Sequence, residues 1–269
     1  MIRPKTLIKW SGSKRSQARE IIPYFPAEFN VYYEPFLGGG SILGFFNPKK
    51  AVAGDVDKPL IQLWKLIQDN PNSVIQEYKK NWNNLQTKGY RFFYEIRDRF
   101  NQERSPHHLL FLSRTCVNGL IRYNQKGEFN NSLHHTRKGI NPETLGKIIL
   151  DWSVQIKGHK FRETSYEITT KSAKAGDFIY LDPPYFNTKG RYQSSINYDD
   201  FLNYLRDLNK RKIKFALSYD GTRGEKSYIV EIPKDLYKRH VMMHSGNSTF
   251  NKIQNKKIEK VHESLYLNF

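Results

Sequence analysis

The tetrapeptide Asp182-Pro183-Pro184-Tyr185 has the residue types best suited to chemistry in this chain. It follows an apolar run at 178–181 that is typical of a short buried strand. We therefore expect it at a strand's carboxyl end, where open α/β sheets bind their ligands. Its two prolines stiffen the loop and donate no backbone hydrogen bond, which leaves carbonyl oxygens free to accept.

Such a site would suit a planar group that carries an exocyclic NH2. The carboxylate of Asp182 and a carbonyl of the proline pair could accept its two N–H bonds, while the ring of Tyr185 stacks on its face. The alternative interpretation is a plain turn after the strand, because Asp and Pro favour turns for local reasons.

A second candidate site lies near the start of the chain. Residues 31–35 read as a strand, the glycines at 38–40 as a turn and 42–46 as an apolar helix. A strand, a glycine turn and a helix in this order are typical of the start of a doubly wound nucleotide-binding fold, because glycines let the backbone pass close to a ligand. The spacing matches neither the dinucleotide fingerprint nor a P-loop.

The next predicted strand, 51–55, ends in Asp55, fifteen positions beyond Gly40. An acid near this position typically binds the ribose hydroxyls of an adenosine-type ligand. The alternative role is to cap the following helix, for which Asp57 is better placed.

The charge of the chain favours a polyanionic partner, most often nucleic acid. Over 269 residues there are 44 Lys and Arg against 26 Asp and Glu, a formal charge of +18. The segment from Lys79 to Lys138 holds twelve basic and four acidic residues with interleaved aromatic rings. We expect this segment to face phosphates; a solvated basic surface is the alternative.

Other features restrict the compartment and the cofactors. Cys116 is the only cysteine, which excludes an internal disulfide and favours a reducing, cytoplasmic location. No apolar run is long enough for a membrane span, and a signal peptide is not expected. The adjacent pairs His107-His108 and His134-His135 lack the spacing of metal ligands, so no metal is expected.

The hydrophobic periodicity divides the chain into two parts. Apolar residues repeat at helical spacing from residue 59 to about 117, and strand patterns return only near 161. We predict an α/β catalytic, cofactor-binding domain formed by 1–57 and 150–269, interrupted by a basic helical domain at 58–149. A helix is expected at 198–210, a strand at 215–219, a polar loop at 245–249, and an edge or final strand at 264–269.

The end of the basic segment, 114–138, is loop-like and dense in hydrogen-bond donors. Arginine and asparagine are the side chains that read guanine and adenine edges, although contacts to phosphate or water are the commoner role of any one of them. The donors are Arg114, Asn118, Arg122, Asn124, Lys126, Asn130 and Asn131.

Taken together, these stretches resemble the Dam-type, alpha-group DNA adenine-N6 methyltransferases. Residues 9–14 are similar to the family's Lys-Trp-x-Gly-x-Lys segment, and 34–41 to its first cofactor motif. Residues 114–130 are similar to the DNA-contacting hairpin of its target-recognition domain, and 182–185 to its catalytic motif. The motifs follow one another in the family's order.

The resemblance implies a Rossmann-like, seven-stranded S-adenosylmethionine-dependent methyltransferase sheet with an inserted helical target-recognition domain. It implies methyl transfer from S-adenosyl-L-methionine to adenine N6 in duplex DNA by base flipping, with a cognate restriction endonuclease as a further candidate partner. At position 117 a valine replaces the family's frequent aromatic residue, and 131–134 departs from the pattern of GATC-specific members. The resemblance therefore supports adenine-N6 chemistry without implying the site GATC.

The resemblance also assigns residues to three roles. The catalytic group is Asp182, Pro183, Pro184 and Tyr185. The cofactor-binding group is Trp10, Lys14, Phe36, Gly38, Gly40, Asp55, Ser165, Tyr166 and Asp182. The DNA-binding group is Arg114, Asn118, Arg122, Asn124, Lys126 and Asn130.

Other functions stay open from the sequence alone. Similar tetrapeptides occur in methyltransferases that act on RNA adenine or on protein amides, which are also planar NH2 groups. A sequence-specific DNA-binding protein without turnover is a second alternative, and the intact Lys14, Asp55 and Asp182 argue against it. A restriction endonuclease is disfavoured because no Asp-x-Glu-x-Lys-like cluster is present.

Overall fold

A computed structural model describes residues 5–136, 138–184, 196–223, 226–227, 232–247 and 260–269. Among these residues the sheet has eight strands: seven follow the order β3-β2-β1-β4-β5-β8-β7, and β6 pairs with β5 outside this path. The strands are β1 (Tyr32–Glu34), β2 (Ala51–Asp55), β3 (Lys160–Glu163), β4 (Phe178–Leu181), β5 (Lys214–Arg223), β6 (Lys226–Ser227), β7 (Arg239–Asn247) and β8 (Lys260–Leu267).

The first five strands are parallel, and β8 and β7 add an antiparallel pair. From β1 the chain moves outward through β2 to β3, and it then returns to the other side of β1 with β4 and β5. The strand order therefore reverses between β1 and β4. The carboxyl ends of β1 and β4 flank this switch point, where open α/β sheets bind ligands.

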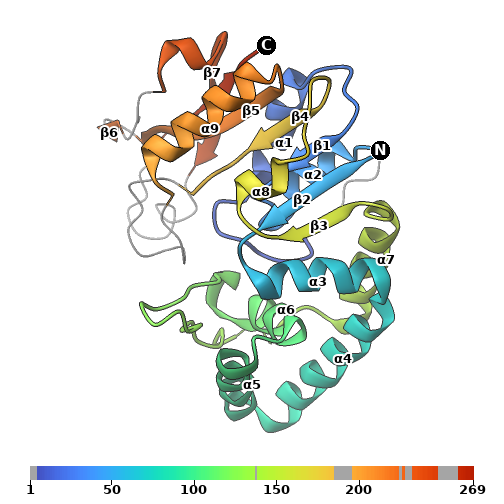
Figure 1. Cartoon of the computed structure of the whole chain (residues 1–269). Helices are drawn as coiled ribbons and strands as arrows, with labels where there is room; N and C mark the ends of the chain where they lie inside the picture. Colours follow the sequence, from blue (N-terminus) through green and yellow to red (C-terminus); the bar gives the residue numbers. More distant parts are fainter. Residues whose placement is uncertain (1–4, 137, 185–195, 224–225, 228–231, 248–259) are drawn as a thin grey trace.

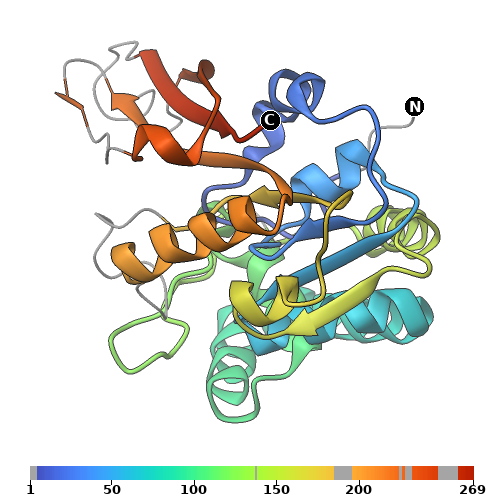
Figure 2. The ribbon, with the colours of Figure 1, turned by 45° about the horizontal axis from the view of Figure 1, so that its top comes forward.

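Helices cover both faces of the sheet, which explains why the central strands β1 and β4 are buried along their whole length. Alternate residues of β1 and β4 belong to different hydrophobic clusters. Tyr32, Phe178 and Tyr180 pack on one face, and Tyr33, Ile179 and Leu181 pack on the other. The second face is covered by α8 (Tyr166–Thr170) and α9 (Tyr198–Lys210), which lie in front of the sheet in Figures 1 and 2.

The opposite face is covered by α1 (Ala18–Ile21), α2 (Ser41–Phe46) and α3 (Lys58–Asp69). Asp57 caps α3, since its Oδ1 accepts from the Leu60 amide at 3.0 Å. Four 3₁₀ turns complete the connections: η1 (Lys14–Ser16), η2 (Ile22–Tyr24), η3 (Val117–Gly119) and η4 (Lys234–Leu236).

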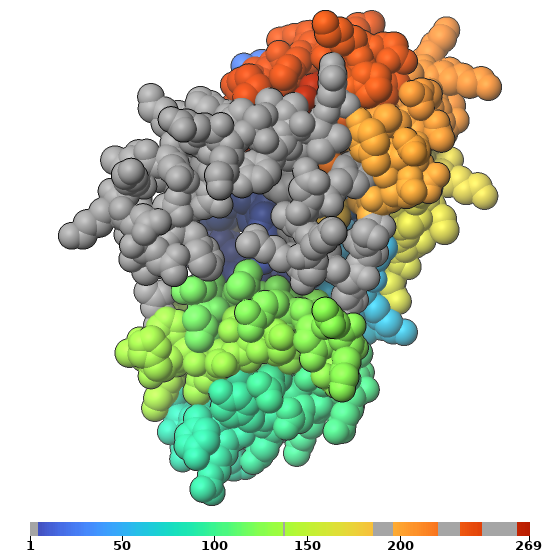
Figure 3. Space-filling view, turned by 90° about the vertical axis from the view of Figure 1, so that its left-hand side faces the viewer, coloured from blue at the N-terminus to red at the C-terminus, as the bar shows by residue number. Residues whose placement is uncertain are grey.

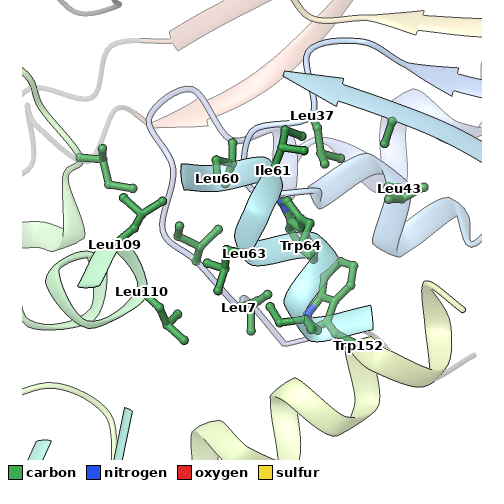
Figure 4. Close-up of a cluster of buried hydrophobic side chains, with 14 of the residues drawn as sticks. Leu7, Leu37, Leu43, Leu60, Ile61, Leu63, Trp64, Leu109, Leu110 and Trp152 are labelled. Carbon is green, nitrogen blue, oxygen red and sulfur yellow. The ribbon is translucent and has the colours of Figure 1, made fainter. Parts of the chain in front are cut away.

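Between β2 and β3 the chain forms a set of helices below the sheet in Figure 1. After α3 these are α4 (Pro71–Lys88), α5 (Tyr90–Glu103), α6 (Pro106–Thr115) and α7 (Pro142–Gln155). Their core is continuous with that of the sheet: Trp64 of α3 stacks on Phe161 of β3 and meets Trp152 of α7 edge-on. Figure 4 shows this junction, with Leu109 and Leu110 of α6 on its other side.

The sequence predicted most elements within a few residues, including a final strand at 264–269, but it missed the strand β7. Residues 239–247 form the strand β7, so 245–247 are not part of the polar loop expected at 245–249, and 248–249 lie outside the described residues. The final strand begins at 260 and lies between β5 and β7, inside the sheet and not at its edge. In β7 the apolar residues 241–243 are consecutive and 239–240 are polar and exposed, so the strand lacks the alternation that marks a half-buried strand. The boundaries of the helical domain stay a prediction.

Gly54 in β2 allows α8 to pack closely on the sheet. An added methyl group would lie 2.3 Å from Thr169 Oγ1 and 2.8 Å from its Cγ2, so α8 would have to move. We expect Gly54→Ala to lower the free energy of unfolding by about 1–3 kcal/mol, as measured by urea denaturation.

Gly146→Ala is the matched control, because its methyl group would meet the Ile75 side chain no closer than 3.5 Å. Gly146 lies within α7, so alanine should be neutral or stabilising by up to about 1 kcal/mol. Equal unfolding free energies for the two variants would contradict the packing argument.

Candidate active site

A pocket of about 410 Å³ opens at the carboxyl ends of β1, β2 and β4, at the switch point of the sheet. Its lining comes from stretches far apart in the sequence: 10–14, 34–39 with 41–42, 55–57, 121 and 123, 165–167, 182–184, and 196, 197 and 200. Figure 3 shows a hollow on this side of the molecule, with N-terminal residues (blue) at its bottom and the green segment around 110–135 along its lower rim.

The proline corner lies directly after β4 and lines this pocket. Asp182, Pro183 and Pro184 are all part of the lining, whereas Tyr185 lies outside the described residues. Asp182 Oδ1 accepts from the Lys14 ammonium at 2.6 Å, and Lys14 is only 5% exposed. Burial raises the pKa of the Asp182 carboxyl to about 6, although the nearby ammonium lowers it.

Asp55 ties the glycine turn to the end of β2. Its Oδ2 accepts from the Gly38 amide and its Oδ1 from the Asp57 amide, both at 3.0 Å. Burial raises the pKa of Asp55 to about 6 against these backbone hydrogen bonds. The carboxylate therefore holds the loop in place while it faces the pocket.

The glycine turn passes close under Trp10. Gly38 has φ +49°, and a methyl group there would lie 2.6 Å from the Trp10 ring, so both the conformation and the space require glycine. Gly39 lines the pocket, but Gly40 does not. Gly40 begins α2 at φ +63° and packs against Trp64, so it supports the turn from behind.

Two aromatic side chains form one wall. The rings of Phe36 and Tyr166 stack with centroids 5.4 Å apart, and Ser165 is the residue before α8. Of the nine residues predicted to bind the cofactor, eight line one pocket and Gly40 is the exception. The eight are Trp10, Lys14, Phe36, Gly38, Asp55, Ser165, Tyr166 and Asp182. Their individual roles stay predictions.

Two further carboxyl groups were missed by the sequence argument. Glu34, at the end of β1, lines the pocket and is 3% exposed, and Tyr32 Oη donates to its Oε2 at 2.7 Å. Burial raises the pKa of Glu34 to about 8. Its position at a strand end could have identified it. Glu263 of β8 lies 3.7 Å from the Lys14 ammonium, and no local motif pointed to it.

Among the predicted DNA contacts, Arg114 has an inward position. Its guanidinium donates to the Thr6 carbonyl and is largely buried, and burial lowers its pKa. Arg114 therefore holds the N-terminal segment against α6, and the prediction that it reads DNA loses its geometric support. The sequence could not separate this arginine from a solvent-facing one, because both fit a basic helix end.

The other predicted DNA contacts lie on the loop after α6. Arg122 donates from Nε to Asn130 Oδ1 at 2.8 Å across a bridge between Tyr123 and Phe129. Asn124 Oδ1 accepts two amide hydrogens and closes the turn around the exposed Lys126. Exposed Asn118 has φ +57°, in the left-handed region. Contact with DNA by these residues stays a prediction.

A chain of partly buried hydrogen bonds connects this loop to the pocket. Tyr123 Oη donates to Asp57 Oδ2 at 3.0 Å, and Asp57 in turn donates its amide to Asp55. The guanidinium of Arg104 lies 5.4 Å from the Tyr123 ring centroid and donates to the Gly127 carbonyl. This role of Tyr123 and Arg104 was not predicted, because no motif or periodicity in the sequence indicates such a long-range hydrogen-bond link.

Two negative findings apply to the described residues only. No group of three or more His, Cys, Asp or Glu is arranged there to hold a metal ion. None of the helices in this part of the chain combines the length and apolar character needed to cross a membrane.

The parallel strands, the switch-point pocket and the antiparallel last pair define the class of the fold, which is that of the Rossmann-like S-adenosylmethionine-dependent methyltransferases. The family is more specific. The model of the D12 class N6 adenine-specific DNA methyltransferases matches residues 10–249, and the chain belongs to this family. It is a site-specific DNA methyltransferase that acts on adenine N6.

Individual relatives agree with the family. The type II methyltransferase M.MjaIII of Methanocaldococcus jannaschii is 30% identical over 244 residues, which cover 80% of this chain and 83% of that protein. The DNA adenine methylase of Serratia marcescens is 29% identical, with 69% of this chain and 68% of the relative covered. The DNA N-6-adenine-methyltransferase of Escherichia phage P1 is 30% identical over 81% of this chain and 30% of its own length.

Proposed function

We propose that the pocket binds S-adenosyl-L-methionine and presents Asp182 and Pro183 to an adenine extruded from duplex DNA. The observation that carries the proposal is the buried Lys14–Asp182 pair, at 2.6 Å, in the same pocket as Asp55 and the Gly38 turn. The enzyme family implies this methyl donor. The residues present fit it, because the pocket has the volume of a small-ligand site, and the glycine turn lets the backbone approach closely.

The cofactor would supply an electrophilic methyl group on a sulfonium sulfur. On the protein side, the Asp55 carboxylate would accept hydrogen bonds from ribose hydroxyls, and the Phe36–Tyr166 wall would cover the adenine ring of the donor. Trp10 would close the side next to the glycine turn. These contacts would orient the donor, so that the rate of methyl transfer depends mainly on how the methyl group and the target nitrogen are positioned.

Asp182 acts on the target base in this proposal. Lys14 occupies Oδ1 of the carboxylate, which directs Oδ2 and the Pro183 carbonyl toward the two N6 hydrogens. Accepting both hydrogens pulls N6 toward tetrahedral geometry and localises its lone pair for in-line attack. The N6 proton then passes to a carboxylate whose pKa lies near neutrality. Tyr185 would stack on the extruded ring and offset part of the unstacking cost.

The loop after α6 would provide the DNA contacts. Arg122, Lys126 and Asn118 are exposed on it, and the chain carries a formal charge of +18. Exposed cations of this kind bind phosphates, and base contacts then select the site. A restriction endonuclease that cuts the same unmodified site would be the functional partner, as type II relatives suggest.

One experiment tests the methylation activity and its target site together. The chain is expressed in a bacterial host without adenine methylation, and the host genome is sequenced for N6-methyladenine. We expect methylation at one short sequence, with a site other than GATC favoured by Val117 and residues 131–134. An Asp182→Ala chain expressed at the same level is the control. Unmodified DNA, or scattered modification without a common sequence, would contradict the proposal.

The two buried acids of the site predict a pH profile. Burial raises the pKa of Asp182 and of Asp55 to about 6, and both act as ionised acceptors. Activity is therefore lost as the pH falls through about 6, where these groups become protonated. We expect kcat/KM for the cofactor to rise from pH 5 to pH 7.5 with a midpoint near 6.

The bound sulfonium adds a positive charge, which favours the carboxylates, so the midpoint in kcat should lie below that in kcat/KM. Steady-state rates in buffers of constant ionic strength check both values. A kcat/KM that is flat from pH 5 to pH 7 would rule out either acid as an essential acceptor.

A further inference from the structure

Glu263 lies in the last strand of the sheet, β8, outside the segment 10–249 that the family model matches. β8 runs antiparallel between β5 and β7, and this brings Glu263 next to the 3₁₀ turn that begins at Lys14. Glu263 Oε2 is 3.7 Å from Lys14 Nζ, and its side chain is 19% exposed. A residue near the end of the chain thus reaches the buried lysine of the active site.

Lys14 is therefore held between two carboxylates on different strands. Asp182 follows β4 and is 2.6 Å away, while Glu263 approaches from β8 at 3.7 Å. A buried ammonium needs such partners, because removing it from water is costly unless it is paired. The ammonium donates to Asp182 Oδ1 at 2.6 Å and to the Gly12 carbonyl at 3.4 Å, and the Glu263 charge at 3.7 Å attracts it from a second side, so it stays where it can bond Oδ1 of Asp182. Without Glu263 the lysine would lose one of these anchors.

We propose that Glu263 is a positioning residue for methyl transfer: it anchors the Lys14 ammonium, which in turn orients the Asp182 carboxylate toward adenine N6. The inference depends on the proposed role of Asp182. It adds a group from β8 to a reaction otherwise assigned to β1, β2, β4 and the N-terminal turn.

The charges around Asp182 predict what happens when Glu263 becomes neutral. Lys14 lowers the pKa of Asp182, and Glu263 raises it through its negative charge. Among the described residues, the titratable groups Glu34 and Tyr32 of β1 and Tyr180 of β4 also interact with Asp182. The change to glutamine leaves these groups in place and removes one repulsive charge. Because the ammonium keeps its 2.6 Å hydrogen bond to Oδ1 and only the direction of the pair changes, Asp182 should then ionise at lower pH.

The experiment compares Glu263→Gln with wild-type enzyme in single-turnover methyl transfer to a duplex that contains the site found by genome sequencing. Single turnover removes product release from the rate. We expect the rate at pH 8 to fall about tenfold, because a misplaced acceptor costs positioning. The acid midpoint of the profile should move down by about 0.5 pH unit, because the repulsion is gone.

Two further variants separate positioning from structure. Glu263→Asp keeps the charge and should retain the wild-type midpoint. Glu77→Gln removes a partly exposed carboxylate that pairs with Lys80 at 3.4 Å on α4, and it should change neither the rate nor the midpoint. Thermal melting with and without S-adenosylmethionine reports the fold of each variant.

An unchanged rate and midpoint in Glu263→Gln would overturn the inference, as would a lower rate with an unmoved midpoint. A glutamine variant that no longer folds would also overturn it, because it would make Glu263 a structural group. If Asp182→Ala were active in the same assay, the proposed mechanism itself would fail. The two failures are therefore distinguishable.

Discussion

Alanine at position 182 is expected to reduce single-turnover methyl transfer by about 10³-fold or more, while the affinity for duplex DNA changes by less than about threefold. Asp182 supplies the carboxylate that would accept an N6 hydrogen, and it is the only acid among the described residues 182–184 that follow β4. It lines the pocket and is paired with the buried Lys14, whereas the cations expected to contact DNA are exposed on the loop after α6. Transfer of a labelled methyl group and fluorescence anisotropy of labelled duplex measure the two quantities separately.

Asp182→Asn is the sharper control for this prediction. The amide keeps the size of the side chain and can still accept one hydrogen bond, but it removes the charge that pairs with Lys14. We expect it to be nearly as inactive as the alanine variant. Transfer at the wild-type rate in either variant would exclude Asp182 as the acceptor and leave the pocket without a base-activating group.

The sequence predicted the arrangement of the site where topology alone determines it. Asp55 and Asp182 each follow an apolar run that could be read as a strand, and parallel strands bring their carboxyl ends to one edge. The glycine turn at 38–40 follows β1 at that same edge. A doubly wound fold therefore gathers these residues without any knowledge of distances.

The contacts that depend on long-range packing could not be predicted. Lys14 and Asp182 are 168 positions apart, and their ion pair depends on how the N-terminal segment crosses the sheet. Glu263 reaches Lys14 only because β8 is inserted between β5 and β7, and no short-range pattern encodes that order. Each of these facts is a property of the whole fold.

The two arginines at helix ends make the same point. Arg104 and Arg114 both end a helix of the basic segment, and both donate to a backbone carbonyl. Arg104 supports the loop that is predicted to meet DNA, whereas Arg114 holds the N-terminal segment. The basic composition of residues 79–138 predicted that both arginines face phosphates, because charge density does not reveal on which side of a helix a guanidinium lies.

Alanine at position 55 is expected to weaken binding of S-adenosylmethionine by about 100-fold or more, because two or more hydrogen bonds to a charged acceptor contribute about 1.5–3 kcal/mol each. Asp55 accepts from the Gly38 and Asp57 amides, so its removal frees the glycine turn as well as the ribose position. Isothermal titration calorimetry without DNA measures the dissociation constant directly.

Two further variants show whether the loss of S-adenosylmethionine binding is specific to the Asp55 carboxylate. Asp69→Ala removes an exposed carboxylate at the end of α3 and should leave the dissociation constant unchanged. Asp55→Asn can still accept at one oxygen, so it should bind more weakly than wild type but better than alanine. If the asparagine and alanine variants both bound the cofactor like wild type, Asp55 would only organise the link from the glycine turn to Asp57. The ribose would then have to be held by other groups of the pocket.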